Sequence, residues 1–295
     1  MSMNKILLID GNLLAFKSFF ATAYIGSSLQ TSTGIPTNAV HTFINTIFKL
    51  LKELNPTHIF VAFDKPGKTF RHEFFEEYKS KRQSTPDSLK VQFIYIKRVL
   101  SKMRICWFEE SLIEADDLIA TWVSKINTSK DEVIVYSSDK DLLQLVAKNV
   151  SVISKWDKNE YVIDNENNFF ERHSIFPNQI PDFKALAGDA SDNYLGISGI
   201  GPKTAINLLS EFQIIENLYE NLANIKSKKV KEVLELEKDK AFLYKKIAKL
   251  KTDVNLNFSL EDIKLSYKFQ KEAMEIFEEL EMKNTSSKYL NVFNL

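Results

Sequence analysis

The sequence is poor in residues that support disulfide or nucleophilic chemistry. Its 295 residues include one cysteine, four histidines and eight glycines. Cys106 lies in the apolar run RICWF, so we interpret it as a core residue rather than a nucleophile. A single cysteine excludes a disulfide within the chain and favours a reducing compartment. The histidines, at positions 41, 58, 72 and 173, are scattered and suggest no Ser-His-Asp arrangement.

Long apolar segments and a net charge are also absent from the sequence. No apolar run approaches the roughly 20 residues that a membrane-spanning helix needs, and the short apolar run near the N-terminus does not have the form of a signal peptide. We therefore expect a cytoplasmic monomer without a membrane partner. The formal net charge is zero, which by itself does not indicate a polyanionic partner. No phosphate-binding loop occurs, which weighs against a nucleoside triphosphatase.

The neutral total conceals two basic segments. Residues 65–104 contain eleven lysines and arginines against four acidic residues, and residues 226–251 contain ten lysines against four acidic residues. Such segments are either solvated helix faces or surfaces that bind a phosphate polymer. Charge alone leaves both interpretations open.

Short apolar segments alternate with helical patterns over the first two thirds of the chain. We expect strands at residues 5–9, 58–63, 105–108 and 133–136, and a further pair at 151–154 and 160–163. We expect helices between them, at residues 13–21, 37–54, 89–102 and 115–126. This alternation predicts an α/β fold with a central, mostly parallel sheet flanked by helices.

From about residue 177 the pattern becomes helical. Helices are expected at residues 181–187, 203–212, 214–222, 238–250 and 269–280. We therefore predict an α/β core over residues 1–176 and a helical region over residues 177–295. The core carries an insertion near residues 65–104. Its first part, 65–86, has few apolar anchors and is expected to arch over the strand ends, where α/β folds place functional insertions.

Carboxylates recur where predicted strands end or helices begin. There are nine, in five clusters: Asp10, Asp64, Glu114, Asp116, Asp117, Asp139, Asp141, Asp189 and Asp192. Because parallel strands all end at one edge of a sheet, we expect these side chains to meet in one crevice. Their mutual repulsion would cost several kcal/mol without a bound cation. Oxygen ligands suit Mg²⁺ or Mn²⁺, and the number of carboxylates fits two ions.

A simpler interpretation exists for some of these clusters. Acidic residues in the first turn of a helix are favoured by the helix dipole, which alone could account for Glu114-Ala-Asp-Asp. An ordinary turn and helix cap could account for Asp139-Lys-Asp141. The recurrence of acidic clusters at five separate places favours the metal site over capping.

The segment 197–205, ISGIGPKTA, joins a glycine turn to the start of a helix. Backbone N–H groups there, together with Lys203 and Thr204, form a ready anion site. A glycine turn between two packed helices is the plain alternative. Followed by Pro-Lys-Thr, the segment predicts a helix-hairpin-helix element, which holds the phosphate backbone of a duplex without reading bases.

Seven segments, in this order and spacing, resemble the 5′–3′ exonuclease family: LLIDGN, THIFVAFD, TFRHEFFEEYKSKR, EADD, SSDKDLLQL, FKALAGDASDN and GISGIGPKTA. That family includes the N-terminal nuclease domain of bacterial DNA polymerase I and the phage flap endonucleases. The resemblance covers roughly residues 4–250 and implies a PIN-like 5′-nuclease fold in a stand-alone protein. It also implies two-metal cleavage of 5′ flaps and 5′ ends of DNA, including RNA primers at RNA–DNA junctions, in replication and repair. A separate DNA polymerase is then a candidate partner.

The resemblance implies roles for individual residues. The first metal site would comprise Asp10, Asp64, Glu114, Asp116, Asp117 and Asp139, and the second Asp141, Asp189 and Asp192, with Asp139 near both ions. Lys79 and Arg82 would contact the scissile phosphate and act in catalysis with Asp139. Tyr78 would stack on a base, and Arg71 and Lys184 would line the cleft. Gly199, Gly201, Lys203 and Thr204 would hold the duplex, with K⁺ near the two glycines.

The sequence departs from the family pattern at two positions. Ser80 and Ser138 stand where relatives usually carry glycine. Neither removes a carboxylate, so we expect an active enzyme. Two alternatives stay open: an RNA-directed nuclease with a related acidic cluster, against which the helix-hairpin-helix speaks, and a catalytically inactive scaffold that binds duplex or flap DNA.

Overall fold

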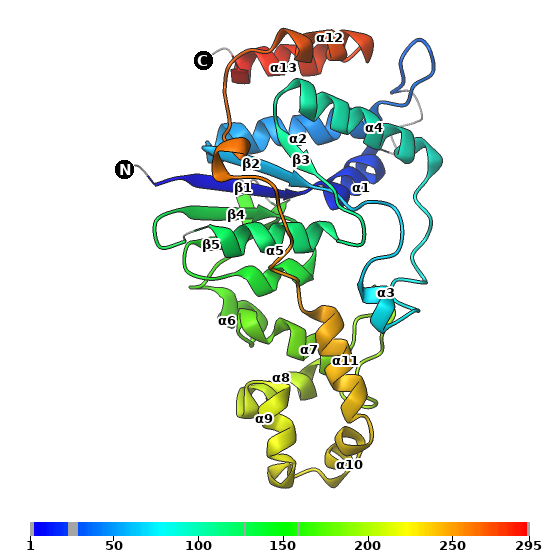
Figure 1. The fold of residues 1–295 in the computed structure, drawn as a ribbon, viewed down its shortest axis with the longest axis vertical. Coiled ribbons are helices and arrows are strands. Elements are labelled where there is room, and N and C mark those ends of the chain that lie inside the picture. Colours follow the sequence, from blue (N-terminus) through cyan, green and yellow to red (C-terminus); the bar gives the residue numbers. More distant parts are fainter. Residues whose placement is uncertain (1–2, 23–28, 127, 158–159, 294–295) are drawn as a thin grey trace.

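A six-stranded sheet forms the centre of the protein, which a computed structural model describes over residues 3–22, 29–126, 128–157 and 160–293 (Figure 1). The strands are β1 (Lys5–Asp10), β2 (His58–Ala62), β3 (Cys106–Phe108), β4 (Glu132–Tyr136), β5 (Val150–Asp157) and β6 (Glu160–Asp164), in the order β3-β2-β1-β4-β5-β6. All neighbouring pairs are parallel except β5 and β6, which are antiparallel. The predicted mostly parallel sheet is therefore confirmed.

Helices cover one face of this sheet in two layers. The first layer is α1 (Gly11–Thr22), α2 (Asn38–Leu54) and α4 (Asp87–Lys102). Above it, α12 (Lys271–Glu279) lies on α4 and α13 (Lys283–Phe293) lies on α2 (Figure 1). Since α4 packs on α2, the residues from 87 onward belong to the core layers, and the predicted arch is limited to the residues before them.

The other face carries the remaining helices. They are α5 (Ala115–Lys125), α6 (Phe169–His173), α7 (Ile180–Ala187), α8 (Pro202–Phe212), α9 (Ile215–Glu220), α10 (Lys228–Leu236) and α11 (Lys238–Ala248). The short α3 (Arg71–Phe74) lies beside α11. Four 3₁₀ turns complete the fold: η1 (Lys140–Leu145), η2 (Pro177–Gln179), η3 (Leu222–Asn224) and η4 (Leu260–Ile263). Within the described ranges, none of the helices is long and apolar enough to span a bilayer.

Two separate hydrophobic cores lie on the two faces of the sheet. Side chains of a strand point alternately to opposite faces. In β1, Ile6 and Leu8 therefore enter the core with α5 and the following helices, while Leu7 and Ile9 enter the core with α1, α2 and α4. Burial on both faces explains why this strand is a continuous apolar run rather than an alternating one.

Four helices in the described part of the chain were not predicted from the sequence: α3, α6, α10 and α13. The helices α3 and α6 have four and five residues, too few to show a helical period. The helix α10 buries Leu234, with Val230 and Val233 partly buried beside it. The helix α13 buries Thr285, Tyr289 and Phe293, one of which is polar, against α2, which is distant in sequence, and a local pattern does not reveal such a contact.

The chain after α11 leaves the helical part and returns to the sheet. The Leu265 backbone N–H donates to Thr57 O at 2.9 Å, and η4 contacts β2. The final helices then close over α2 and α4, far from α8 and α9 in Figure 1. Residues 177–295 thus occupy two places in the fold, one beneath the sheet and one above it.

Candidate active site

An acidic cleft opens at the carboxyl ends of the central strands. Asp10 ends β1, Asp64 follows β2, Asp139 follows β4, and Glu114 and Asp116 lie at the start of α5. All five line one pocket of about 410 Å³, together with Lys79 and Arg82 of the predicted arch. The convergence expected from the parallel topology is therefore present in the structure.

Backbone and hydroxyl groups orient the first two carboxylates. Asp10 accepts hydrogen bonds from the Leu13 backbone N–H and the Ser137 hydroxyl, both at 2.9 Å. Asp64 accepts from the Ala115 backbone N–H at 2.7 Å, at the start of α5. The side chain of Asn12 accepts from the Asp64 N–H at 3.0 Å, which ties the end of β2 to α1.

Five of the aspartates form two adjacent groups that could each hold a cation. Oxygen atoms of Asp116, Asp139 and Asp141 lie within 4.8 Å of one another, and so do oxygen atoms of Asp141, Asp189 and Asp192. The residue common to both groups is Asp141, whereas the resemblance led us to expect Asp139 in that place. Asp10, Asp64 and Glu114 line the same cleft but lie outside these two tight groups.

Basic side chains neutralise one part of the cleft. Lys184 Nζ lies 2.6 Å from Asp189 Oδ2 and also contacts Asp141. Lys79 Nζ lies 2.8 Å from Glu114 Oε2. Burial alone would raise the pKa values of Glu114 and Asp189, but these lysines outweigh it, with Arg71 assisting at Glu114, and each pKa falls to about 2.

Another part of the cleft has almost no cationic partner. Burial raises the pKa of Asp10 to about 7, with further contributions from the charges of Asp64 and Asp139. Burial likewise raises the pKa of Asp116 well above its usual range, aided by Asp139 and Asp10. Negative charge at these two residues is therefore costly unless a cation enters the cleft.

Arg71 and Asp117 are paired with each other and do not face the cleft. The guanidinium donates to both carboxylate oxygens of Asp117, at 2.7 and 2.8 Å, and to Ile247 O at 2.9 Å. Arg71 is 1% exposed and Asp117 is fully buried. The roles that the resemblance implied, DNA contact for Arg71 and metal ligation for Asp117, do not match these positions. The pair instead joins the foot of the arch to α5 and α11.

The implied base-stacking role of Tyr78 also disagrees with its position. Tyr78 is 2% exposed, and its hydroxyl lies 3.2 Å from both Glu114 Oε2 and Asp192 Oδ2. Its ring packs with Tyr194 and Ile247. A ring buried in this way offers no free face to a base, so Tyr78 supports the carboxylates instead.

Sequence reasoning missed three polar residues that position the acidic residues. The Ser137 hydroxyl donates to the Asp10 carboxylate, and the Thr69 hydroxyl donates to Glu114 at 3.2 Å. The Asn12 side chain accepts from the backbone N–H of Asp64. Ser137 and Asn12 adjoin acidic motifs in the sequence, and this adjacency could have identified them. The two serines that depart from the family pattern fit the fold: Ser80 Oγ lies 2.9 Å from Asn193 Nδ2, and the backbone of Ser138 avoids the left-handed region that would require glycine.

The predicted hairpin lies between α7 and α8. Ile197 and Ile200 are buried, whereas Gly199, with φ of 76°, and Lys203 are exposed. Glu237 accepts hydrogen bonds from the Ser198 N–H and hydroxyl, at 2.9 and 2.8 Å, and so fixes the turn. The hairpin thus presents backbone groups and a lysine to solvent on a rigid support. Gly201 and Thr204 adjoin the same surface, at the start of α8.

Family models match nearly the whole of this architecture. Residues 5–174 match the 5′–3′ exonuclease N-terminal resolvase-like domain, and residues 175–271 match the 5′–3′ exonuclease C-terminal SAM fold. The chain belongs to the 5′–3′ exonuclease family. The chain is 37% identical to a 5′–3′ exonuclease of Aquifex aeolicus over 99% of its own length and 97% of that protein.

Longer relatives contain a similar segment. The chain is 39% identical to DNA polymerase I of Caldicellulosiruptor bescii over 95% of its own length, but spans only 33% of that polymerase. Among solved structures, a bacteriophage T5 5′-exonuclease with bound zinc matches with a TM-score of 0.68 at 22% identity, over 98% of this chain and 99% of that one. A T5 flap endonuclease complexed with DNA and metal ions matches with a TM-score of 0.67 at 21% identity, over 99% and 100%. These two likenesses show the fold.

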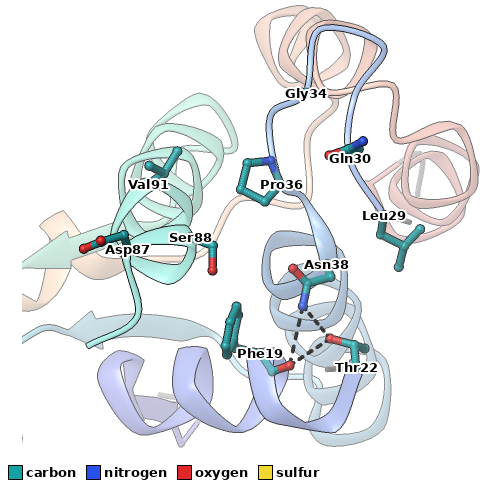
Figure 2. A pocket seen from close by; sticks show the side chains of 10 residues that line it. All are labelled: Phe19, Thr22, Leu29, Gln30, Gly34, Pro36, Asn38, Asp87, Ser88 and Val91. Atoms are coloured by element: carbon teal, nitrogen blue, oxygen red, sulfur yellow. Dashed lines mark hydrogen bonds between the residues drawn. The ribbon is translucent and has the colours of Figure 1, made fainter. Parts of the chain in front are cut away.

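A second pocket of the protein lies away from the carboxylates. It encloses about 600 Å³ between α1, α2, α4 and the segment from Leu29 to Pro36. Figure 2 shows the amide of Asn38 directed at Phe19 O and the Thr22 hydroxyl, at 3.4 and 2.8 Å. No residue that the sequence predicted for the site lines this pocket. We therefore assign the chemistry to the acidic cleft.

Proposed function

We propose that this exonuclease hydrolyses phosphodiester bonds at 5′ ends and 5′ flaps of DNA by a two-metal mechanism. The observation that carries the proposal is the pair of three-carboxylate groups sharing Asp141. We infer the direction of cleavage from the family and the metal-dependent chemistry from the carboxylates of the cleft.

The donor set fits hard divalent cations. It consists of carboxylate oxygens alone, which suit Mg²⁺ or Mn²⁺ and lack the nitrogen or sulfur donors that zinc prefers. Asp116, Asp139 and Asp141 would hold one ion, and Asp141, Asp189 and Asp192 the other. When bound, two such ions activate water and neutralise charge on the phosphodiester. Asp10, Asp64 and Glu114 line the cleft at a position suited to orienting hydration water.

Lys79 and Arg82 are suited to binding the scissile phosphate. They line the cleft together with the carboxylates, and their side chains are 19% and 48% exposed. A cation beside the reacting phosphate stabilises charge that develops there, in a site where water is scarce. In the protein alone these two residues bind Glu114 and Asp192, which keeps them directed into the cleft. Lys184 holds Asp141 and Asp189 in the same way.

The hairpin would hold the duplex beside the cut. Lys203 is exposed at the start of α8, beside Thr204 and the backbone of Gly199 and Gly201. Contacts of this kind bind phosphates regardless of sequence. The family resemblance further suggests that K⁺ binds to carbonyl oxygens near the two glycines. Because α7 links the hairpin directly to Lys184, duplex binding there would place a 5′ terminus near the cleft.

The biological setting is part of the proposal. By analogy with the nuclease domain of DNA polymerase I, we propose that the substrates include RNA–DNA primer junctions in replication and flaps in repair. The protein would act as a monomer in the cytoplasm, with a separate polymerase as its partner.

A labelled 5′-flap DNA tests the proposal. Incubation with Mg²⁺ should release short 5′ products, and EDTA should abolish their release. A matched 3′-flap DNA serves as the control for direction. Tight flap binding without cleavage at any metal concentration would favour an inactive scaffold, and cleavage of RNA alone would favour an RNA-directed nuclease.

A further inference from the structure

A further pocket adjoins the acidic cleft on the side of α4. It encloses about 290 Å³ and is lined by residues of α4 and by Pro66 and Thr85, which lie near the two ends of the predicted arch. Two residues, Asn12 and Asp64, line both this pocket and the acidic cleft. The Asn12 side chain accepts a hydrogen bond from the Asp64 N–H at 3.0 Å, which fixes the boundary between them. This cavity, which we call the α4 pocket, therefore borders directly on the proposed site of cleavage.

The α4 pocket contains an aromatic ring and an available ammonium group. Phe93 is half-buried, and its ring makes edge contacts with Phe16 and Phe63, each with centroids 6.1 Å apart. Lys90 is 58% exposed and pairs with Asp87 at 2.8 Å, at a carboxylate that is 96% exposed. Because exposed pairs of this kind contribute little free energy, Lys90 can exchange this partner for another anion.

The other charged groups of the α4 pocket restrict where a phosphate can bind. Lys97 is already paired with Glu109, and its ammonium lies 5.0 Å from the ring centroid of Phe63. Asp64 would repel a phosphate at the boundary with the cleft. A phosphate in the pocket is therefore expected at Lys90.

The α4 pocket and the hairpin lie on opposite sides of the sheet. The helix α4 packs in the core that also contains α1 and α2, whereas α7 and α8, which flank the hairpin, pack in the core on the other face (Figure 1). In a 5′ flap, the duplex that contains the cleaved strand lies on the 3′ side of the cut. A strand whose duplex is held by the hairpin and whose scissile phosphate lies at the carboxylates would therefore continue toward α4.

We propose that the α4 pocket binds the nucleotide on the 5′ side of the scissile phosphate, with its base against Phe93 and its 5′ phosphate at Lys90. This inference rests on the proposed nuclease function and names a further contact of the substrate. Proteins that bind single strands combine stacking of bases on aromatic rings with contacts to phosphates. The volume lies at the lower limit of small-molecule sites, about 300 Å³. It therefore suits one nucleotide rather than a longer segment.

The experiment removes the base and the phosphate charge from the DNA one at a time. The cut in a 5′-flap DNA is first mapped with the wild type and Mg²⁺. The nucleotide on its 5′ side is then made abasic, or the phosphate that precedes this nucleotide is replaced by an uncharged methylphosphonate. A further DNA carries the abasic nucleotide on the 3′ side of the cut instead. Single-turnover rates are compared with the rate for the intact DNA.

Each change in the DNA is matched by a change in the protein. We expect the wild type to cleave the 5′-side abasic DNA about 10-fold more slowly than the intact DNA, which is within the range for stacking of one base. Phe93→Leu should cleave these two DNAs at the same rate. The methylphosphonate should slow the wild type about 3-fold, as expected for an exposed ion pair, and should not slow Lys90→Ala.

A second aromatic residue of α4 provides the control. Tyr95 does not line the α4 pocket, and its ring centroid lies 5.3 Å from Arg98 Cζ. Tyr95→Leu should therefore discriminate between the intact and 5′-side abasic DNAs as the wild type does. Any effect of the 3′-side abasic nucleotide should be the same in Phe93→Leu and the wild type.

Two results would overturn the proposal. Equal rates of the wild type on intact and 5′-side abasic DNA would show that the protein does not bind this base, and this comparison needs no variant. An undiminished 10-fold discrimination by Phe93→Leu would show that the base lies elsewhere and that Phe93 only supports the fold. Failure of the wild type to cleave the intact DNA would refute the proposed nuclease function as well, and is thereby distinguished from failure of the α4-pocket inference alone.

Discussion

Carboxylates of one cleft differ sharply in their electrostatic state. Glu114 and Asp189 each have a lysine within 2.8 Å, and each pKa lies at about 2. Asp10 and Asp116 have no such neighbour, and burial raises their pKa values, to about 7 for Asp10. Asp10 and Glu114 are both buried, so burial alone does not explain the difference between these two. The presence or absence of a lysine explains it.

The comparison separates two uses of an acidic side chain. A carboxylate that is neutralised by lysine contributes to stability and orients that lysine toward the cleft. A carboxylate without a partner costs free energy when it ionises, and this cost is offset only when a cation binds. Ionisation of the unpaired set, Asp10 and Asp116, is therefore expected to be favoured by cation binding, while Lys79, which is paired with Glu114, is proposed to bind phosphate.

Asp141 belongs to both groups of three aspartates that could hold a cation, and its replacement should have the largest effect. Asp141→Asn should lower the rate of flap cleavage by more than about 100-fold, since even outer-shell partners of a metal can change activity that much. Flap binding should survive, because the hairpin is untouched. Single-turnover cleavage and a gel-shift assay measure the two. Asp253→Asn, at an 81% exposed side chain, is the control. Unchanged turnover would contradict the shared-ligand assignment.

Removing a lysine should convert a paired carboxylate into an unpaired one. Lys79→Ala should raise the pKa of Glu114 and slow cleavage by roughly 100-fold, the usual loss when one donor to a developing charge is deleted. The rate at saturating DNA should fall more than affinity does. Lys81→Ala, at an exposed neighbour in the arch, is the matched control. A loss of DNA affinity without a loss of rate would mean that Lys79 contacts the phosphate backbone of DNA but does not act in cleavage.

Burial should decide how much an ion pair contributes to folding. Arg71 binds Asp117 through two hydrogen bonds in the interior, and Arg98 binds Glu279 through two hydrogen bonds at 2.9 Å on the surface, where Arg98 is 43% exposed. Arg71→Ala should destabilise the protein by about 3–5 kcal/mol because it leaves a buried charge unpaired.

The surface pair provides the control. Arg98→Ala should cost no more than about 1 kcal/mol, since exposed pairs are screened by solvent. Urea midpoints measured in EDTA compare the two variants. Equal losses of stability would mean that burial does not increase the contribution of the Arg71–Asp117 pair to folding.

The sheet was predictable from sequence because its strands are covered on both faces. Residues 6–9 form an unbroken apolar run, which is typical of a buried parallel strand. The carboxylates were predictable in turn because they follow these strands. The helices α3, α6, α10 and α13 were not: α3 and α6 have only four and five residues, and α13 depends on its contact with α2, which is distant in sequence.

The sequence does not reveal which side chains of the site contact each other. Arg71 and Asp117 are 46 residues apart, and their charges would equally suit a DNA contact and a metal ligand. Tyr78 belongs to an aromatic and basic segment typical of nucleic-acid binding, yet its hydroxyl supports Glu114 and Asp192. Motifs identify residue types that meet in the cleft, but only the packed structure shows which partner each one has.

Metal removal at different pH values tests the unpaired set directly. The pKa of Asp10 is about 7 in the folded protein against 3.8 ordinarily, so the folded state binds the proton more tightly than the unfolded state. Its contribution to stability is present at low pH and is lost as the pH rises through about 7. Glu114, with a pKa of about 2, behaves oppositely, and its contribution is lost only as the pH falls toward 2.

The protein in EDTA should therefore unfold at a lower temperature at pH 8 than at pH 5. Excess Mg²⁺ should raise the unfolding temperature more at pH 8, because cation and proton compete for the same oxygens. In Asp10→Asn, which cannot ionise, the decline in EDTA between these pH values should become smaller, whereas in Asp253→Asn it should persist. An Mg²⁺ effect of equal size at both pH values would show that the unpaired carboxylates are already ionised without metal, and would remove the distinction between the two sets.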